Sequence, residues 1–134
     1  MIELNAIPEV ALDCLNEDHR EAANIINQLD ACLQQEPFPS AELTPLFNRL
    51  VEHIENHFAC EEHQMEKYQF PALVTHRQEH QRILAEIKQK QKHGFNEKLD
   101  ALNYLQNVFT PWLIEHVATL DTETARYIVN AGGR

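Results

Sequence analysis

The chain is poor in the residues that interrupt regular structure and in those that build disulfide frameworks. It holds only 3 glycines and 3 cysteines among 134 residues. Cys14, Cys32 and Cys60 are odd in number and lack the close spacing of a metal site, so we interpret them as reduced thiols. No segment shows the alternation of apolar and polar residues that is typical of a β-strand, and no internal repeat is visible. The sequence therefore argues against β-rich, disulfide-stapled and repeat architectures.

Basic residues are also scarce. Lysine and arginine total 11 against 21 acidic residues, which gives a formal net charge of −10. This balance argues against binding to nucleic acid or to an anionic membrane surface. No apolar run approaches the roughly 20 residues that cross a bilayer, and residues 1–10 lack the basic region of a secretory signal. We expect a cytoplasmic protein with a single domain over residues 1–134, and a monomer.

Proline and glycine divide the chain into four long helices and a short fifth. We expect helices from about Leu12 to Gln35, from Ser40 as N-cap to Tyr68, from Pro71 to Lys92, from Asn96 to Ala118, and from Thr122 to Asn130. Gly94 should end the third helix, and Pro111 should kink the fourth. Because the linkers are short, neighbouring helices should be antiparallel. The sequence predicts an all-α fold, an up-down-up-down antiparallel four-helix bundle with a short extra C-terminal helix.

Five histidines and two carboxylates stand where these helices would otherwise place leucines in the core. In the second helix, for example, His57 and Glu61 continue an apolar stripe through Leu50 and Ile54. Buried imidazole and carboxylate groups are costly unless a partner satisfies them, and helix bundles build metal sites from such inward-facing side chains. We therefore predict a metal site formed by His19, His57, Glu61, His76, His80, His116 and Asp121.

The predicted topology brings these positions together. The start of the first helix, the end of the second, the start of the third and the end of the fourth share one end of the bundle. The six ligand positions from His19 to His116 then lie at a similar depth, about two turns from that end. A pair four residues apart, such as His76 and His80, shares a helical face. Alone, each such pair could also be an ordinary surface or core pair.

His116 and Asp121 are the awkward pair, because they are five residues apart. Residues at this spacing point away from each other on a regular α-helix. If Asp121 is a ligand, a π-type bulge or a break must lie between the two residues. The alternative is that Asp121 is the N-cap of the final helix.

Four segments of the chain resemble the helical signatures of hemerythrins, in the right order and at the right spacing. They are EDHREAANIINQL (17–29), HFACEE (57–62), HRQEH (76–80) and WLIEHVATLD (112–121). The length is that of a single-domain bacteriohemerythrin. The resemblance implies that His76, His80 and His116 hold one iron, that His19 and His57 hold a second, and that Glu61 and Asp121 bridge both. It also implies an oxo or hydroxo bridge and a vacant position on the second iron for dioxygen.

The donor set agrees with that implication. Seven protein ligands are too many for one zinc ion, which takes about four, and mixed imidazole and carboxylate donors suit iron. The neighbours expected to line the oxygen pocket are apolar, namely Phe58, Trp112, Leu113 and Val117. We see no spare inward-facing acid or base, which favours reversible oxygen binding over an enzymatic reaction. His53, His63 and His93 fall off the stripes, and we interpret them as solvated.

The chain departs from the family pattern in a few places. Ile7 and Ala11 stand where a tryptophan and a glycine are usual, and Asn16 replaces an aspartate; these changes concern the N-terminal arm. Ala22 replaces a leucine that lines the oxygen pocket. Three alternatives remain open: a sensor of oxygen, nitric oxide or redox state; an enzyme that handles peroxide or nitric oxide or repairs iron–sulfur clusters; and a bundle without metal.

Overall fold

The computed structural model of the chain describes residues 6–35, 40–95 and 97–133. Its elements are α1 (Asp13–Leu33), α2 (Ser40–Lys67), α3 (Leu73–His93), α4 (Lys98–Asn103), the π-helical segment η2 (Tyr104–Phe109), α5 (Thr110–His116), a second π-helical segment η3 (Val117–Asp121) and α6 (Thr122–Asn130). No strand occurs in the described ranges. The prediction of an all-α fold is confirmed.

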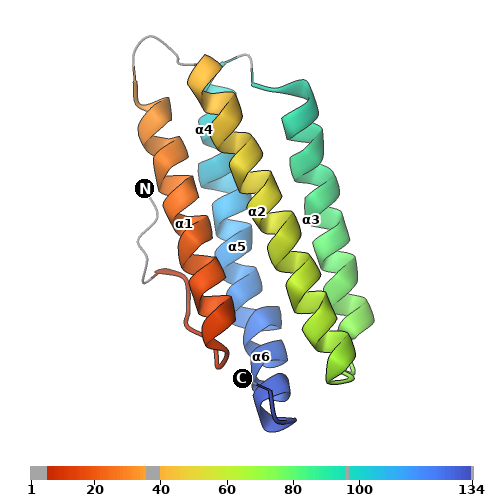
Figure 1. The fold of residues 1–134 in the computed structure, drawn as a ribbon. Coiled ribbons are helices and arrows are strands. Elements are labelled where there is room, and N and C mark those ends of the chain that lie inside the picture. The colour runs from red at the N-terminus through yellow and green to blue at the C-terminus, as the bar shows by residue number, and fades with distance from the viewer. Residues whose placement is uncertain (1–5, 36–39, 96, 134) are drawn as a thin grey trace.

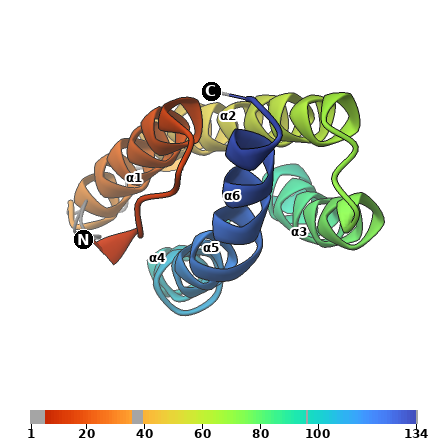
Figure 2. The same cartoon turned by 90° about the horizontal axis from the view of Figure 1, so that it is seen from below.

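The helices form the predicted up-down-up-down bundle (Figure 1). Helix α1 packs against α2, α2 packs against α3, and α4 returns to contact α1. Seen along the bundle, α6 turns inward and also contacts α2 (Figure 2). The start of α1, the end of α2, the start of α3 and the α5–α6 region therefore meet at one end of the molecule.

The last helical stretch differs from the prediction. We expected the fourth helix to stop near Ala118, but η3 connects α5 directly to α6, and helical structure continues from Lys98 to Asn130. The predicted start at Asn96 lies outside the described residues. Pro111 is the second residue of α5, immediately after η2. Proline cannot donate a backbone hydrogen bond, and the π-segment η2 ends two residues before it; the kink that we expected at Pro111 stays a prediction.

The other helix ends lie close to the predicted ones. The amide of Gly94 donates to the carbonyl of Lys90 at 2.8 Å, and the φ of Gly94 is +70°, a value that favours glycine. Helix α2 begins at Ser40 itself, so Ser40 is a helical residue and not the N-cap. Pro37 and Pro39, which separate the first two predicted helices in the sequence, lie outside the described residues.

A continuous apolar core fills the bundle, with side chains such as Leu29, Leu50 and Ile87 fully buried. The N-terminal arm is tied to this core by Asn16, whose side chain accepts from the amide of Val10 at 2.8 Å and donates to its carbonyl at 3.0 Å. The change from the usual aspartate at position 16 thus concerns the arm, as expected. Within the described ranges, no helix has the length and apolar character that crossing a membrane requires.

Candidate metal centre

All seven predicted ligand residues are buried together at one end of the bundle. None is more than 6% exposed, although each carries a titratable side chain. They come from α1, α2, α3, α5 and η3, whose ends meet there (Figure 1). This convergence follows from the topology, because antiparallel helices with short connections bring the same depth of each helix into register.

Segment η3 brings His116 and Asp121 onto the same face. A π-helix pairs residues five apart, so a five-residue spacing becomes a contact. Nε2 of His116 lies 3.0 Å from Oδ1 of Asp121, and Oδ2 of the same carboxylate lies 3.0 Å from Nε2 of His19. The predicted π-type bulge is therefore confirmed, and the alternative of Asp121 as a side-chain cap is not, since its side chain forms no cap hydrogen bond.

The donors form two overlapping sets. Within each set, one donor atom per residue can be chosen so that all lie within 4.8 Å of one another. Glu61 and Asp121 belong to both sets, which is the arrangement expected of carboxylates that bridge two ions. The larger set is Glu61, His76, His80, His116 and Asp121, and the smaller is His19, His57, Glu61 and Asp121.

Several inward-facing atoms form no regular hydrogen bond to a described residue. They are Nε2 of His57, Nε2 of His80 and both oxygens of Glu61, although Oε1 of Glu61 lies 2.6 Å from Nε2 of His76. Leaving a buried polar atom unsatisfied costs about 1–3 kcal/mol, and more for a charged one. A cation between these atoms would satisfy imidazole nitrogens and carboxylate oxygens together, so the residues present fit a metal site.

The outward-facing nitrogens of three histidines have partners that the sequence analysis missed. Nδ1 of His57 donates to Asp18 at 2.7 Å, and Nδ1 of His80 donates to Glu62 at 3.0 Å. Nδ1 of His76 hydrogen-bonds the hydroxyl of Thr124 at 2.8 Å. Such bonds fix the ring orientation and leave Nε2 for the metal. In the sequence Asp18 stands beside His19 and Glu62 beside Glu61, but this adjacency does not indicate which histidine each carboxylate contacts.

The same contacts set the proton affinities of the apoprotein. Burial lowers the pKa of His57, but the hydrogen bond to Asp18 and the nearby carboxylate of Glu61 outweigh it and raise that pKa to about 10. For His76, the carboxylates of Asp121 and Glu61 outweigh burial in the same way and raise the pKa to about 9. Burial and the neighbouring imidazoles lower the pKa of His80 to about 2. Protons and metal ions therefore compete for His57 and His76.

Two of the predicted pocket residues lie directly on ligand rings. Phe58 stacks on His80 with ring centroids 3.8 Å apart, and Trp112 stacks on His116 at 4.6 Å. The indole N–H of Trp112 donates to Glu79 at 2.7 Å, which fixes the ring. The other three predicted pocket residues are buried, and their role toward dioxygen stays a prediction; they are Ala22, Leu113 and Val117.

The remaining histidines divide into two kinds. His63 and His93 are exposed, as expected. His53 is not simply solvated, because it is half-buried and its Nε2 hydrogen-bonds the backbone carbonyl of Asp18 at 2.9 Å. Its ring also stacks near that of His57, at 6.5 Å. Cys14 and Cys60 are exposed free thiols and Cys32 is a buried one.

Comparison with known proteins agrees with this geometry. A family model described as the hemerythrin HHE cation-binding domain matches residues 10–127. The chain belongs to the hemerythrin family. This is a family of non-haem di-iron proteins that bind oxygen.

Hemerythrin-family relatives in three bacteria show how far the similarity extends. A bacteriohemerythrin of Aquifex aeolicus (strain VF5) is 28% identical over 130 residues, which cover 96% of this chain and 98% of the relative. One from Stenotrophomonas maltophilia (strain R551-3) is 22% identical over 81% of this chain and 69% of its own length. One from Ralstonia nicotianae (strain ATCC BAA-1114 / GMI1000) is 26% identical over 69% of this chain and 67% of its own length.

Proposed function

We propose that this hemerythrin binds dioxygen reversibly at a pair of iron ions held at the buried end of the bundle. The observation that carries the proposal is the pair of overlapping donor sets with Glu61 and Asp121 in common. One iron would be held by His76, His80 and His116, and the other by His19 and His57, with both carboxylates shared. Iron held by these residues would supply the two electrons that reversible binding of dioxygen requires.

The unequal size of the two sets gives the pair an open side. The set around His76 offers five protein donors, and the set around His19 and His57 offers four. An ion with fewer protein donors keeps room for a small exogenous ligand. We therefore propose that dioxygen enters beside His19 and His57. Ala22 follows His19 by one helical turn and would lie at this entrance.

The surroundings favour binding over catalysis. At the donor end of the bundle, the buried polar side chains that the structure describes besides the seven donors are Asn16 and Thr124. Asn16 is bonded to Val10, and Thr124 to His76. At this end the described residues therefore offer no further buried acid or base to deliver a proton for O–O cleavage. We propose a carrier or scavenger of oxygen, and one domain for the whole chain.

Rapid mixing of the reduced, iron-loaded protein with dioxygen tests this proposal. The optical spectrum should change on mixing and should return when dioxygen is removed under argon, over repeated cycles. The same reduced protein is mixed with peroxide and with nitric oxide for comparison. Many turnovers of peroxide per chain, or irreversible oxidation in the first oxygen cycle, would favour an enzyme and contradict reversible binding.

A further inference from the structure

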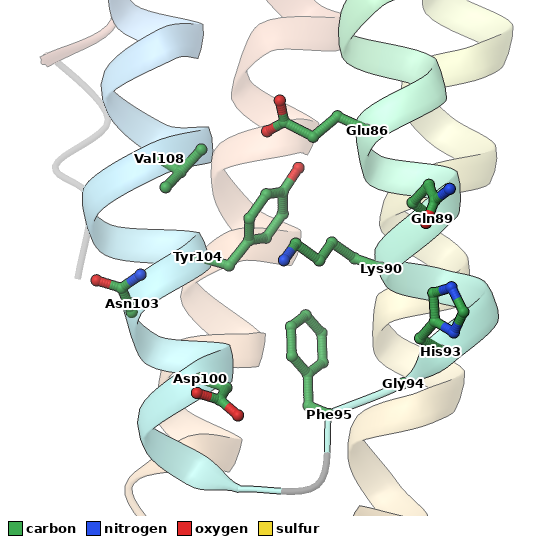
Figure 3. Close-up of a pocket in the computed structure, with 10 residues that line it drawn as sticks. All are labelled: Glu86, Gln89, Lys90, His93, Gly94, Phe95, Asp100, Asn103, Tyr104 and Val108. Carbon is green, nitrogen blue, oxygen red and sulfur yellow. The ribbon is translucent and has the colours of Figure 1, made fainter.

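The end of the bundle opposite the iron ligands carries a cleft that the proposed oxygen chemistry does not use. It has a volume of about 620 Å³ and lies between the last turns of α3 and the α4–η2 stretch (Figure 3). From α3 come Glu86 and Lys90, from η2 comes Tyr104, and Phe95 closes the cleft below. A cleft of this size holds a small organic molecule.

The cleft contains two buried polar atoms whose main neighbours are each other. Tyr104 is only 3% exposed, and its hydroxyl lies against the carboxylate of Glu86 without forming a regular hydrogen bond. Oε1 of Glu86 is buried, whereas the side chain as a whole is 35% exposed and its Oε2 lies 3.8 Å from Nη1 of Arg82. Figure 3 shows this carboxylate directly above the tyrosine hydroxyl. Burial, with the charge of Glu86, raises the pKa of Tyr104, so the ring carries a neutral hydroxyl.

The rings of the cleft favour a cation. The lining carries the carboxylates of Glu86 and Asp100 and the ammonium of Lys90, and the exposed guanidinium of Arg82 lies beside Glu86. The rings of Tyr104 and Phe95 lie side by side with centroids 6.3 Å apart, and aromatic faces attract cations. The chain's net charge of −10 also concentrates cations near its surface.

The protein already places one ammonium in this cleft. Nζ of Lys90 lies 5.5 Å from the centroid of the Tyr104 ring, within cation–π range. Lys90 is an exposed residue on a flexible stem, so it can leave this position at little cost. A neighbouring hollow of about 140 Å³ shares Lys90 and Phe95 and reaches the apolar Leu43, which offers room for an apolar group.

We propose that this cleft binds a small organic ammonium, which takes the place of the Lys90 side chain over Tyr104 and donates to Glu86. The apolar part of the ligand would pack on Phe95. Segment η2, which begins at Tyr104, would be the local distortion that serves this second site, since π-segments occur often at functional sites. The site is distinct from the donor cluster, because it lies at the other end of α3.

Calorimetric titration of the iron-loaded full chain tests the proposal with two probes of similar size and opposite charge. These are 2-phenylethylammonium and 3-phenylpropionate. The ammonium should bind and the carboxylate should not. Glu86→Gln should weaken ammonium binding roughly tenfold, because a charge-assisted hydrogen bond is lost. Lys90→Gln should tighten it about threefold, because the competing cation is removed.

Two further variants keep the test decisive. Lys92→Gln changes the net charge equally but outside the cleft, and should leave the affinity near the wild-type value. Tyr104→Phe removes only the hydroxyl and serves if Glu86→Gln folds poorly; it should also weaken binding. The proposal is overturned if 3-phenylpropionate binds and Lys90→Gln abolishes that binding, or if neither probe binds at millimolar concentration, which would mean that water alone fills the cleft.

Discussion

The two ends of this bundle bury opposite kinds of side chain at equivalent positions. On α2, Leu50 and Ile54 are at most 1% exposed, and about two turns beyond Ile54 the carboxylate residue Glu61 is also 1% exposed. On α3 the order is reversed, with His76 and His80 buried before the apolar positions begin. Burial alone therefore does not distinguish the ends. The difference shows that one end is packed mainly with apolar side chains, whereas the other buries a cluster of donors that fits a metal site.

The strongest test of this difference is removal of a carboxylate that both donor sets share. Glu61→Ala should lose both irons, because Glu61 contributes to each set. The matched control is His63→Ala, which changes an exposed histidine two residues away on the same helix and should keep two irons. Metal analysis of both variants, after confirmation of helical content by circular dichroism, gives the result. Retention of two irons by Glu61→Ala would rule out its bridging role.

Shortening a side chain at the apolar end should have the opposite result, a loss of stability with no loss of iron. Leu50→Ala leaves a cavity in a fully buried position and should lower the free energy of unfolding by about 2–5 kcal/mol. Iron content should stay at two per chain, because the donor residues are untouched. Denaturant unfolding and metal analysis on the same sample check both parts. Loss of iron without loss of stability would show that the two ends are not separable in this way.

Much of this contrast could be predicted from the sequence. The 3.6-residue periodicity and the positions of Gly94 and Pro71 indicate the helices, and polar residues at inward positions indicate the candidate ligands. The five-residue spacing of His116 and Asp121 required a π-type bulge, which η3 provides. Such predictions succeed where a residue type conflicts with its expected burial.

Other features could not be predicted, for a physical reason. Asp18 and Glu62 look like surface acids in the sequence, and their contacts with His57 and His80 depend on how neighbouring helices pack. No predicted ligands stand five residues apart within η2, so nothing in the sequence indicated a π-helical segment there. The cleft beside Tyr104 depends on the separation of α3 from α4, which is set by tertiary packing.

The proton balance of iron binding provides a third test of the ligand end. In the apoprotein the pKa values of His57 and His76 are raised to about 10 and about 9, so both rings are protonated at pH 7. Iron binds neutral imidazole, so loading at pH 7 should release about two protons from these rings. The apparent affinity for iron should then fall about a hundredfold for each pH unit below about 9, where both rings are protonated.

Anaerobic loading in weak buffer with a pH indicator measures this release. Asp18→Asn is the informative variant, because it removes the carboxylate that holds the proton on His57. With that pKa lowered, the variant should release fewer protons as the starting pH approaches 9. Iron uptake that releases no protons in the wild-type protein would show that these imidazoles are not the ligands.

The smallest expected effect concerns Ala22, which is 2% exposed. Alanine is smaller than leucine by about three heavy atoms, and the space persists unless neighbours collapse into it. Ala22→Leu should therefore slow both autoxidation of the oxygenated protein and the entry of azide. Stopped-flow rates of autoxidation and azide entry for Ala22→Leu test whether Ala22 faces the open side. Ala23→Leu makes the same change at the next residue and is the control. Unchanged rates in Ala22→Leu would remove it from the pocket.

Metal analysis of the protein purified without added metal tests the central claim most directly. The claim is that seven buried donors from different helical segments hold a pair of iron ions. The measurement should give two irons per chain, together with a melting temperature that falls when the iron is removed, since a ligand that binds only the folded state stabilises it. One zinc ion per chain at full occupancy, with no iron, would contradict the account.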